Sequence, residues 1–175
     1  VAPSPRAWCD SRAEVCRVAS RRAARPPAGH RSLILIAETG PQDTKLGWPL
    51  SEGGDDLDAL WNDDMHHSAI VALTGRHEAY YSDYRGKPQE FVSAVKYGFL
   101  FQGQRYKWQR NRRGMPAWGL RPAQFVTFIQ NHDQIANSAR GERVHRLASP
   151  GNLRAVTALL LLGPNTPMLF QGQEF

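Results

Sequence analysis

Two short apolar runs, each ending directly in polar side chains, restrict the folds open to this chain more than any other feature. The first, SLILIAETG, covers residues 32–40 and carries Glu38; the second, FVTFIQNHD, covers residues 125–133 and ends at Asp133. Strands that are apolar along their length are typical of parallel sheets, which are covered on both faces. The carboxyl ends of parallel strands share one edge of a sheet, so we expect Glu38 and Asp133 to lie on a common face.

Segments with helical features separate the predicted strands. A strand-like piece over residues 57–61 is followed by Asp63 and Asp64, which favour a helix start, and Gly75 ends that helix. A clearer helix is predicted in KPQEFVSAVKYGFLFQG, where Pro88 stands near the first turn.

The C-terminal part continues the same alternation. SPGNLRAVTALLLLGPN is predicted to be a helix with Ser149 as its cap and Gly163 as its stop, and its run AVTALLLLG is predicted to be a core element. TPMLFQGQEF supplies the last strand, and KWQRNRRGMPAWGLRP is predicted to be a polar loop. Alternating strands and helices indicate an α/β fold, and polar groups at each strand end are typical of a (β/α)8 TIM barrel. Only about four strands are found, so we predict a partial barrel with unpaired edge strands.

The composition changes abruptly near residue 31. Residues 1–31 contain seven Arg against one Asp and one Glu, which accounts for +5 of the formal charge of +6. Cys9 and Cys16 also lie there, and their spacing fits neither a metal motif nor a disulfide framework. We therefore predict two regions, an atypical Arg-, Ala- and Pro-rich lead-in over residues 1–31 and a folded domain over residues 32–175.

The charge distribution and hydropathy limit the classes of partner. A nucleic-acid partner would depend on the basic end alone, because the remainder of the chain is nearly neutral. No apolar run reaches the ~18 residues of a membrane span, and the start lacks the apolar middle of a secretory signal. We predict a cytoplasmic protein with no nucleic-acid and no membrane partner; the non-enzymatic alternative is a basic binding module that uses the Arg-rich end.

Two carboxylates at one sheet edge suit glycosidic-bond chemistry. An oxocarbenium-like transition state requires a proton donor and nearby negative charge, which Glu38 and Asp133 could supply, and His132 could bind sugar hydroxyls. The alternatives are a solvent-facing strand end for Glu38 and a turn fixed by Asn131 and Asp133.

Two further polar segments have simple structural interpretations. In WNDDMHH, adjacent His66 and His67 would point about 100° apart on a helix and would chelate a metal poorly. Cleft lining and helix capping are preferred, and we predict no metal and no cofactor. Basic residues beside Trp108 in KWQRNRRG could bind single-stranded nucleic acid, but a solvated loop is the simpler interpretation.

Four stretches together resemble the α-amylase superfamily of glycoside hydrolases, and within it the malto-oligosyltrehalose trehalohydrolases. They are LIAETGPQDTKL, LWNDDMHHSAIVALTGRHEAYYSDYRG, FIQNHDQIANSARGER and GPNTPMLFQGQEF, which recur in order over residues 33–175. NHD alone indicates only the superfamily, whereas NDDMHH with QNHDQI is more specific to the trehalohydrolase branch. Ala136 departs from that branch, which often has Gly.

The resemblance implies a reaction and roles for individual residues. The reaction hydrolyses the α-1,4 bond beside the terminal trehalose of a malto-oligosaccharide, with retention of configuration. Glu38 matches the general acid/base, and Asp133 matches the carboxylate that stabilises the transition state. The predicted substrate-binding residues are Gln130, Asn131, His132, Asp63, Asp64, His66 and His67.

One element of the family pattern is missing. The nucleophilic Asp should end a strand a few tens of residues before Glu38, but the Arg-rich lead-in stands there. We therefore interpret residues 32–175 as roughly the last four strands of a catalytic barrel, and predict that the chain alone is inactive and poorly stable. The alternative enzymes are a related α-glucan branching enzyme or glucanotransferase.

Overall fold

The computed structural model describes residues 34–138 and 140–174. The predicted boundary at residue 31, the Arg-rich lead-in and both cysteines lie outside these residues. Among the described residues, no helix has the length and apolarity needed to cross a bilayer.

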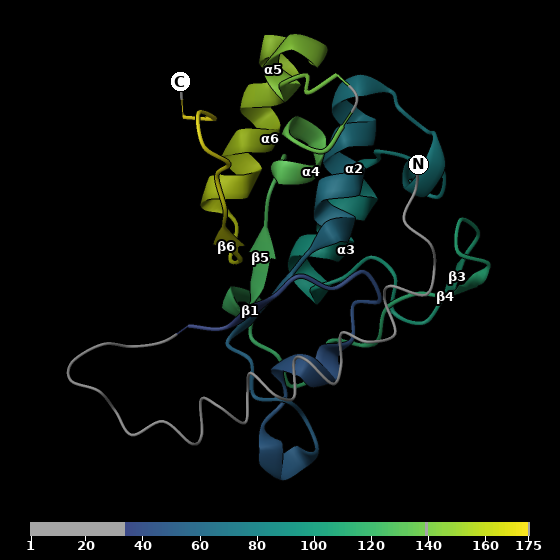
Figure 1. Ribbon diagram of the computed structural model, residues 1–175, viewed down its shortest axis with the longest axis vertical. Coiled ribbons are helices and arrows are strands. Elements are labelled where there is room, and N and C mark those ends of the chain that lie inside the picture. The colour runs from purple at the N-terminus through teal and green to yellow at the C-terminus, as the bar shows by residue number, and fades with distance from the viewer. Residues whose placement is uncertain (1–33, 139, 175) are drawn as a thin grey trace.

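A parallel sheet of four strands forms the centre of the fold (Figure 1). Its strands are β1 (Ile36–Ala37), β2 (Ala59–Trp61), β5 (Phe125–Thr127) and β6 (Thr166–Pro167). They pair side by side in chain order, and all three pairings are parallel. Within the described residues β1 and β6 each pair with a single strand, so the sheet has two open edges. This is the predicted α/β arrangement of consecutive barrel strands.

The longer helices connect the strands, and shorter helices lie in the connections. The α-helices are α2 (Asp63–Thr74), α3 (Pro88–Tyr97), α4 (His132–Ile135), α5 (Val144–Leu147) and α6 (Pro150–Leu162). The 3-10 helices are η2 (Thr44–Gly47), η3 (Leu50–Glu52), η4 (Ala79–Tyr81) and η5 (Pro122–Gln124).

Helix α2 follows β2 directly and is the most buried helix of the fold. Asn62 caps it, because its side-chain oxygen accepts the N–H of Met65 at 3.1 Å. The predicted acidic start is confirmed, with Asp63 and Asp64 in the first turn, where carboxylates face the positive end of the helix dipole. Gly75 ends the helix in the left-handed conformation, at φ 71°. The first turn of α2 is thereby fixed at the carboxyl end of β2.

The other two predicted helices also begin and end near the expected residues. Pro88 opens α3, and the Glu90 carboxylate accepts the N–H groups of Arg85 and Gly86 just before it. The Ser149 hydroxyl accepts the N–H of Asn152 at 3.3 Å and caps α6, which ends before Gly163. Local capping chemistry therefore places these helices as the sequence predicts.

The segment predicted to be a polar loop is more ordered than expected. It contributes β4 (Asn111–Arg112), which pairs antiparallel with β3 (Arg105–Tyr106). The Tyr106 ring is buried against Phe101 and Tyr84, at centroid distances of 5.3 and 6.2 Å. Residues 107–112 are nevertheless exposed, as a solvated loop requires, and the buried Tyr106 just before them anchors the hairpin to the core.

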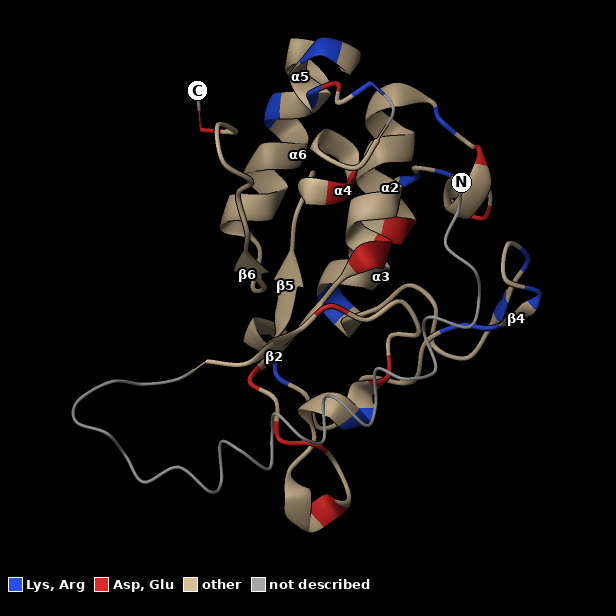
Figure 2. Cartoon of the chain, in the orientation of Figure 1, with Lys and Arg blue, Asp and Glu red and all other residues tan. Residues whose placement is uncertain are grey.

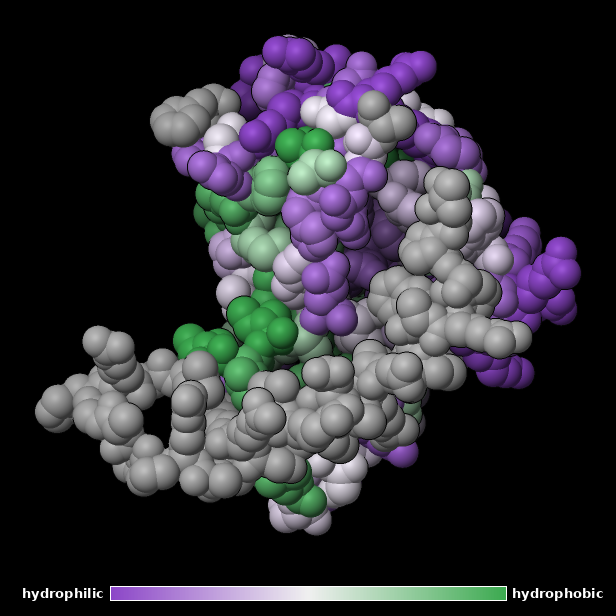
Figure 3. Space-filling view, viewed as in Figure 1, coloured by the Kyte–Doolittle hydropathy of each residue, from purple (hydrophilic) through white to green (hydrophobic). Residues whose placement is uncertain are grey.

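The expectation that AVTALLLLG is a core element is also corrected. Of helix α6 only Leu160 is buried, whereas Leu161 is 49 % and Leu162 85 % exposed. Figure 3 shows hydrophobic residues at the surface on the side where α6 lies. The reason is positional: α6 packs against α2 and α5, and no described element covers its outer face.

Candidate active site

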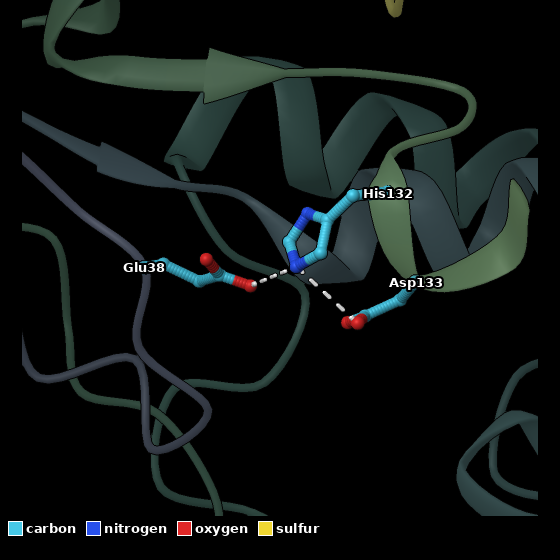
Figure 4. Close-up of side chains that lie close together, drawn as sticks. All are labelled: Glu38, His132 and Asp133. Carbon is cyan, nitrogen blue, oxygen red and sulfur yellow. Dashed lines mark ion pairs between the residues drawn. The ribbon is translucent and has the colours of Figure 1, made fainter. Parts of the chain in front are cut away.

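Three side chains from two separate strand ends meet at the carboxyl edge of the sheet (Figure 4). Glu38 follows β1 directly, and His132 and Asp133 open α4 a few residues after β5. His132 Nε2 lies 3.8 Å from Glu38 Oε1 and 3.3 Å from Asp133 Oδ1. The predicted common face of the two carboxylates is thus present, although 95 residues separate them in the chain (133 − 38).

The strand order explains how these groups meet. β2 lies between β1 and β5, so Glu38 and His132 reach toward each other across the end of β2. Trp61 is the last residue of β2, and its ring centroid lies 6.0 Å from that of His132 and 4.9 Å from that of Phe128. Trp61 therefore lies beside the cluster, a position that only the sheet order reveals.

Local hydrogen bonds fix the orientation of α4. The Asn131 side chain accepts the N–H of Asp133 at 2.9 Å, and the Gln134 side chain accepts the N–H of Asn131 at 2.9 Å. This reciprocal capping box is a strong helix start, and it sets the direction in which His132 and Asp133 leave the backbone. A helix of four residues is short, so these caps carry most of its local order.

The cluster is partly open to water. The side chains of Glu38, His132 and Asp133 are 49 %, 44 % and 52 % exposed. Partial burial raises the pKa of Glu38 above its usual value of 4.5; the His132 imidazole opposes this effect and the Asp133 carboxylate adds to it. A carboxyl group with a raised pKa retains its proton at higher pH, which suits a general acid.

A third carboxyl group, that of Asp63, lies close to the cluster. Burial raises the pKa of Asp63 from 3.8 to about 7, the nearby Arg113 guanidinium opposes this, and the carboxylates of Asp64, Glu38 and Asp133 add to it. Asp63 keeps 24 % of its side chain exposed, and it lies within electrostatic reach of Glu38 and Asp133. Figure 2 shows acidic residues in α4 and in the first turn of α2.

Comparison with known proteins shows which proteins this chain resembles. No protein-family model matches the chain. The chain is 44 % identical over 125 residues to a malto-oligosyltrehalose trehalohydrolase of Deinococcus radiodurans, which covers 68 % of this chain and 20 % of the relative. It is 36 % identical over 142 residues to that of Saccharolobus solfataricus and 38 % over 146 residues to that of Arthrobacter ramosus. Over most of its described length, the chain is similar to one part of the malto-oligosyltrehalose trehalohydrolases.

The chain spans about a quarter of the length of these trehalohydrolases, with 25 % of the Saccharolobus and Arthrobacter proteins covered. A crystal structure of a Salmonella typhimurium protein assigned to the alpha amylases superposes with a TM-score of 0.80. That match has 34 % sequence identity and covers 92 % of this chain and 28 % of the other. The fold is therefore confirmed as a partial α/β barrel of the alpha-amylase type.

Asp64, next to Asp63 in the first turn of α2, has structural partners. It is completely buried, and its carboxylate accepts the hydroxyl of Tyr84 at 2.6 Å, the N–H of Phe101 at 2.8 Å and Nε of Arg113 at 3.3 Å. Its predicted contact with substrate gains no support from this placement. Arg113 is 3 % exposed, so the predicted solvated character of the basic loop is wrong for this residue.

The two histidines of NDDMHH lie in the core beneath the cluster. His66 Nδ1 lies 2.7 Å from the Ile129 carbonyl oxygen, and its ring stacks on Phe128 at a centroid distance of 5.0 Å. His67 packs among Tyr80, Tyr81 and Tyr84. Burial lowers the pKa of His66 to about 4 and that of His67 well below 6.5, so both rings are neutral at pH 7. Neither joins the cluster of Glu38, and their predicted contact with substrate stays without support.

Gln130 and Asn131 are also buried and serve the backbone. Gln130 Oε1 accepts the N–H of Val144 at 3.1 Å, which ties the end of β5 to α5. Asn131 caps α4, as described above. Of the residues predicted to bind substrate, the structure therefore brings His132 into the cluster and Asp63 to its border. The main residue that the sequence prediction missed is Arg113, because its partners lie far away in the chain.

Proposed function

We propose that this chain carries the general acid/base and the transition-state carboxylate of a glycoside hydrolase that releases trehalose from malto-oligosaccharides ending in a trehalose unit. Glu38 would be the acid/base, Asp133 the stabilising carboxylate, and His132 a ligand of sugar hydroxyls. The observation that carries the proposal is that these three half-exposed side chains meet at the carboxyl edge of the sheet. The similarity to trehalohydrolases supplies the substrate class.

The chemistry follows from the position of each group. Glu38, with its raised pKa, would donate its proton to the oxygen of the α-1,4 bond beside trehalose. Positive charge then develops on the sugar ring, where Asp133 would stabilise it electrostatically. A retaining mechanism also needs a nucleophilic carboxylate, and no residue among 34–138 and 140–174 matches the family position expected for it. We infer that the described residues supply some, but not all, of the catalytic residues. The enzyme would be cytoplasmic and would need no cofactor.

A chimeric enzyme tests these roles. Residues 34–174 of this chain would replace the matching segment of the Deinococcus radiodurans trehalohydrolase, and trehalose release would be measured on maltotriosyl trehalose. We expect the chimera to retain activity and Glu38→Gln to lower kcat by about 10²–10⁴-fold, the usual contribution of a general acid. Asp133→Asn should act similarly, whereas Glu52→Gln, an exposed residue away from the cluster, serves as the control. Full activity of the Glu38→Gln chimera would refute the assignment.

A further inference from the structure

A single buried guanidinium connects the segment that carries Glu38 with the first turn of α2. Arg113 Nη1 donates to the carbonyl of Gly40 at 2.6 Å, two residues beyond Glu38. Its Nε donates to Asp64 Oδ1 at 3.3 Å, and its Nη2 lies 3.6 Å from Asp63 Oδ2. The Tyr106 ring covers the guanidinium, with Cζ 5.0 Å from the ring centroid. One side chain from the hairpin region therefore contacts both elements that border the cluster.

The backbone next to Arg113 repeats this link. The N–H of Gly114 donates to the Pro41 carbonyl at 3.1 Å, one residue beyond the carbonyl that Arg113 contacts. Gly114 has a φ of +70°, and a Cβ atom there would lie 1.8 Å from the Phe101 carbonyl oxygen, so only glycine fits. Two neighbouring hydrogen bonds thus hold the two residues Gly40 and Pro41 against the rest of the fold.

The positively charged guanidinium of Arg113 lies beside Asp63, next to the cluster. Its Nη2 is buried and has no hydrogen-bond acceptor among the described residues, and the nearest carboxylate that it faces is that of Asp63. Asp63 in turn lies within electrostatic reach of Glu38 and Asp133. A cation at this place offsets the repulsion among carboxylates that face one another.

We propose that Arg113 is a positioning residue for the Glu38–His132–Asp133 cluster: it fixes the backbone just after Glu38 and offsets the negative charge of Asp63 and Asp64 beside it. The importance of the cluster rests on the function proposed above. The geometric role of Arg113 can be measured without substrate, so the two ideas fail separately.

Hydrogen exchange and carboxyl titration of the 175-residue chain test the proposal. The variants are Arg113→Met, which removes both the charge and the donors, and Arg113→Lys, which keeps the charge but loses the guanidinium fork. The matched control is Arg112→Met, because Arg112 is exposed in the same hairpin and its Nη1 contacts only the Gly103 carbonyl. Exchange is followed in peptides that cover residues 35–43 and, as an internal reference, residues 125–129. The carboxyl carbon of Asp63 is titrated by NMR.

In Arg113→Met we expect exchange over residues 35–43 to become about tenfold faster, as the loss of a charge-assisted hydrogen bond implies, with residues 125–129 unchanged. The pKa of Asp63 should rise above about 7, by roughly one pH unit, because the cation that favours its ionised form is gone. In Arg113→Lys the exchange should be intermediate, about threefold faster, with the pKa of Asp63 near that of the parent chain. Arg112→Met should change neither quantity.

Several outcomes would overturn the proposal. Equal acceleration over residues 35–43 and 125–129 in Arg113→Met would assign Arg113 a role in global stability only. An unchanged pKa of Asp63 in a folded Arg113→Met chain would remove the electrostatic part. If Arg113→Met does not fold, Arg113→Lys decides, since exchange over residues 35–43 at the rate of the parent chain would exclude the positioning role.

Discussion

Replacement of Asp64 by Ala should destabilise the fold severely, although Asp64 stands in a segment predicted to line a substrate cleft. The Asp64 carboxylate is completely buried and accepts hydrogen bonds from Tyr84, Phe101 and Arg113. Burial keeps the pKa of Tyr84 well above its usual value of 10, so its hydroxyl remains a donor that needs an acceptor. The substitution would leave two neutral donors and one buried cation without their acceptor.

The magnitude follows from these three losses. Removing one partner of a buried ion pair costs about 3–5 kcal/mol, and each buried donor left unsatisfied costs about 1–3 kcal/mol. Asp63 lies 3.6 Å from Arg113 Nη2 and retains part of the compensating charge. Because the three effects share one site they do not add, and we expect a loss of about 4 kcal/mol. Native domains are stable by only ~5–15 kcal/mol, so this loss would remove between about a quarter and most of the stability.

Urea unfolding followed by tryptophan fluorescence measures this loss. Asp64→Asn keeps one acceptor oxygen and should lose less than Asp64→Ala. Glu52→Ala removes an exposed carboxylate in η3 and is the control, with an expected change within ~0.5 kcal/mol. A difference of less than ~1 kcal/mol between Asp64→Ala and Glu52→Ala would contradict a structural role. Weaker sugar binding without loss of stability would instead favour direct contact with substrate.

Three further predictions concern pH, association and activity. Burial holds the pKa of His66 at about 4, below 6.5, so the unfolded chain binds more protons between these values, and the free energy of unfolding should be largest above pH 6.5 and fall as the pH drops toward 4. His66→Asn, which can still donate to the Ile129 carbonyl, should reduce this pH dependence in urea titrations at several pH values. An unchanged pH dependence would exclude His66 as its source. The exposed apolar face of α6 should promote self-association, so Leu162→Lys should lower the mean molecular mass measured by light scattering at high protein concentration. An unchanged mass would show that this face is not involved. The 175-residue chain by itself should release no trehalose from maltotriosyl trehalose. Release above a Glu38→Gln control would contradict the inference that the described residues supply only part of the catalytic residues.

The sheet and its helices could be predicted because their signals are local. The apolar runs before Glu38 and Asp133 determine strands by length and composition, and Ser149 and Gly163 bound α6 through short-range capping. The common face of Glu38 and Asp133 followed from the general rule that parallel strands end on one side.

The remaining features depend on contacts that no local pattern encodes. Arg113 reads as a solvated residue in a basic loop, and its burial results from Asp64, 49 residues earlier, and from Gly40, 73 residues earlier. The apolar run in α6 reads as core, but its exposure depends on which elements pack beside it. The sequence alone does not distinguish an Asp whose carboxylate accepts hydrogen bonds in the core from an Asp that faces solvent.

Glu38 follows β1, and among the described residues β1 has β2 as its sole neighbour. The proposed proton donor thus sits on a border strand, where half of its side chain still meets water. A further strand that paired with the free edge of β1 would remove water from around the carboxyl group and raise its pKa further. The pKa of Glu38 would then depend in part on the polypeptide that pairs with β1, so completing the sheet would change the acidity of Glu38 as well as its exposure.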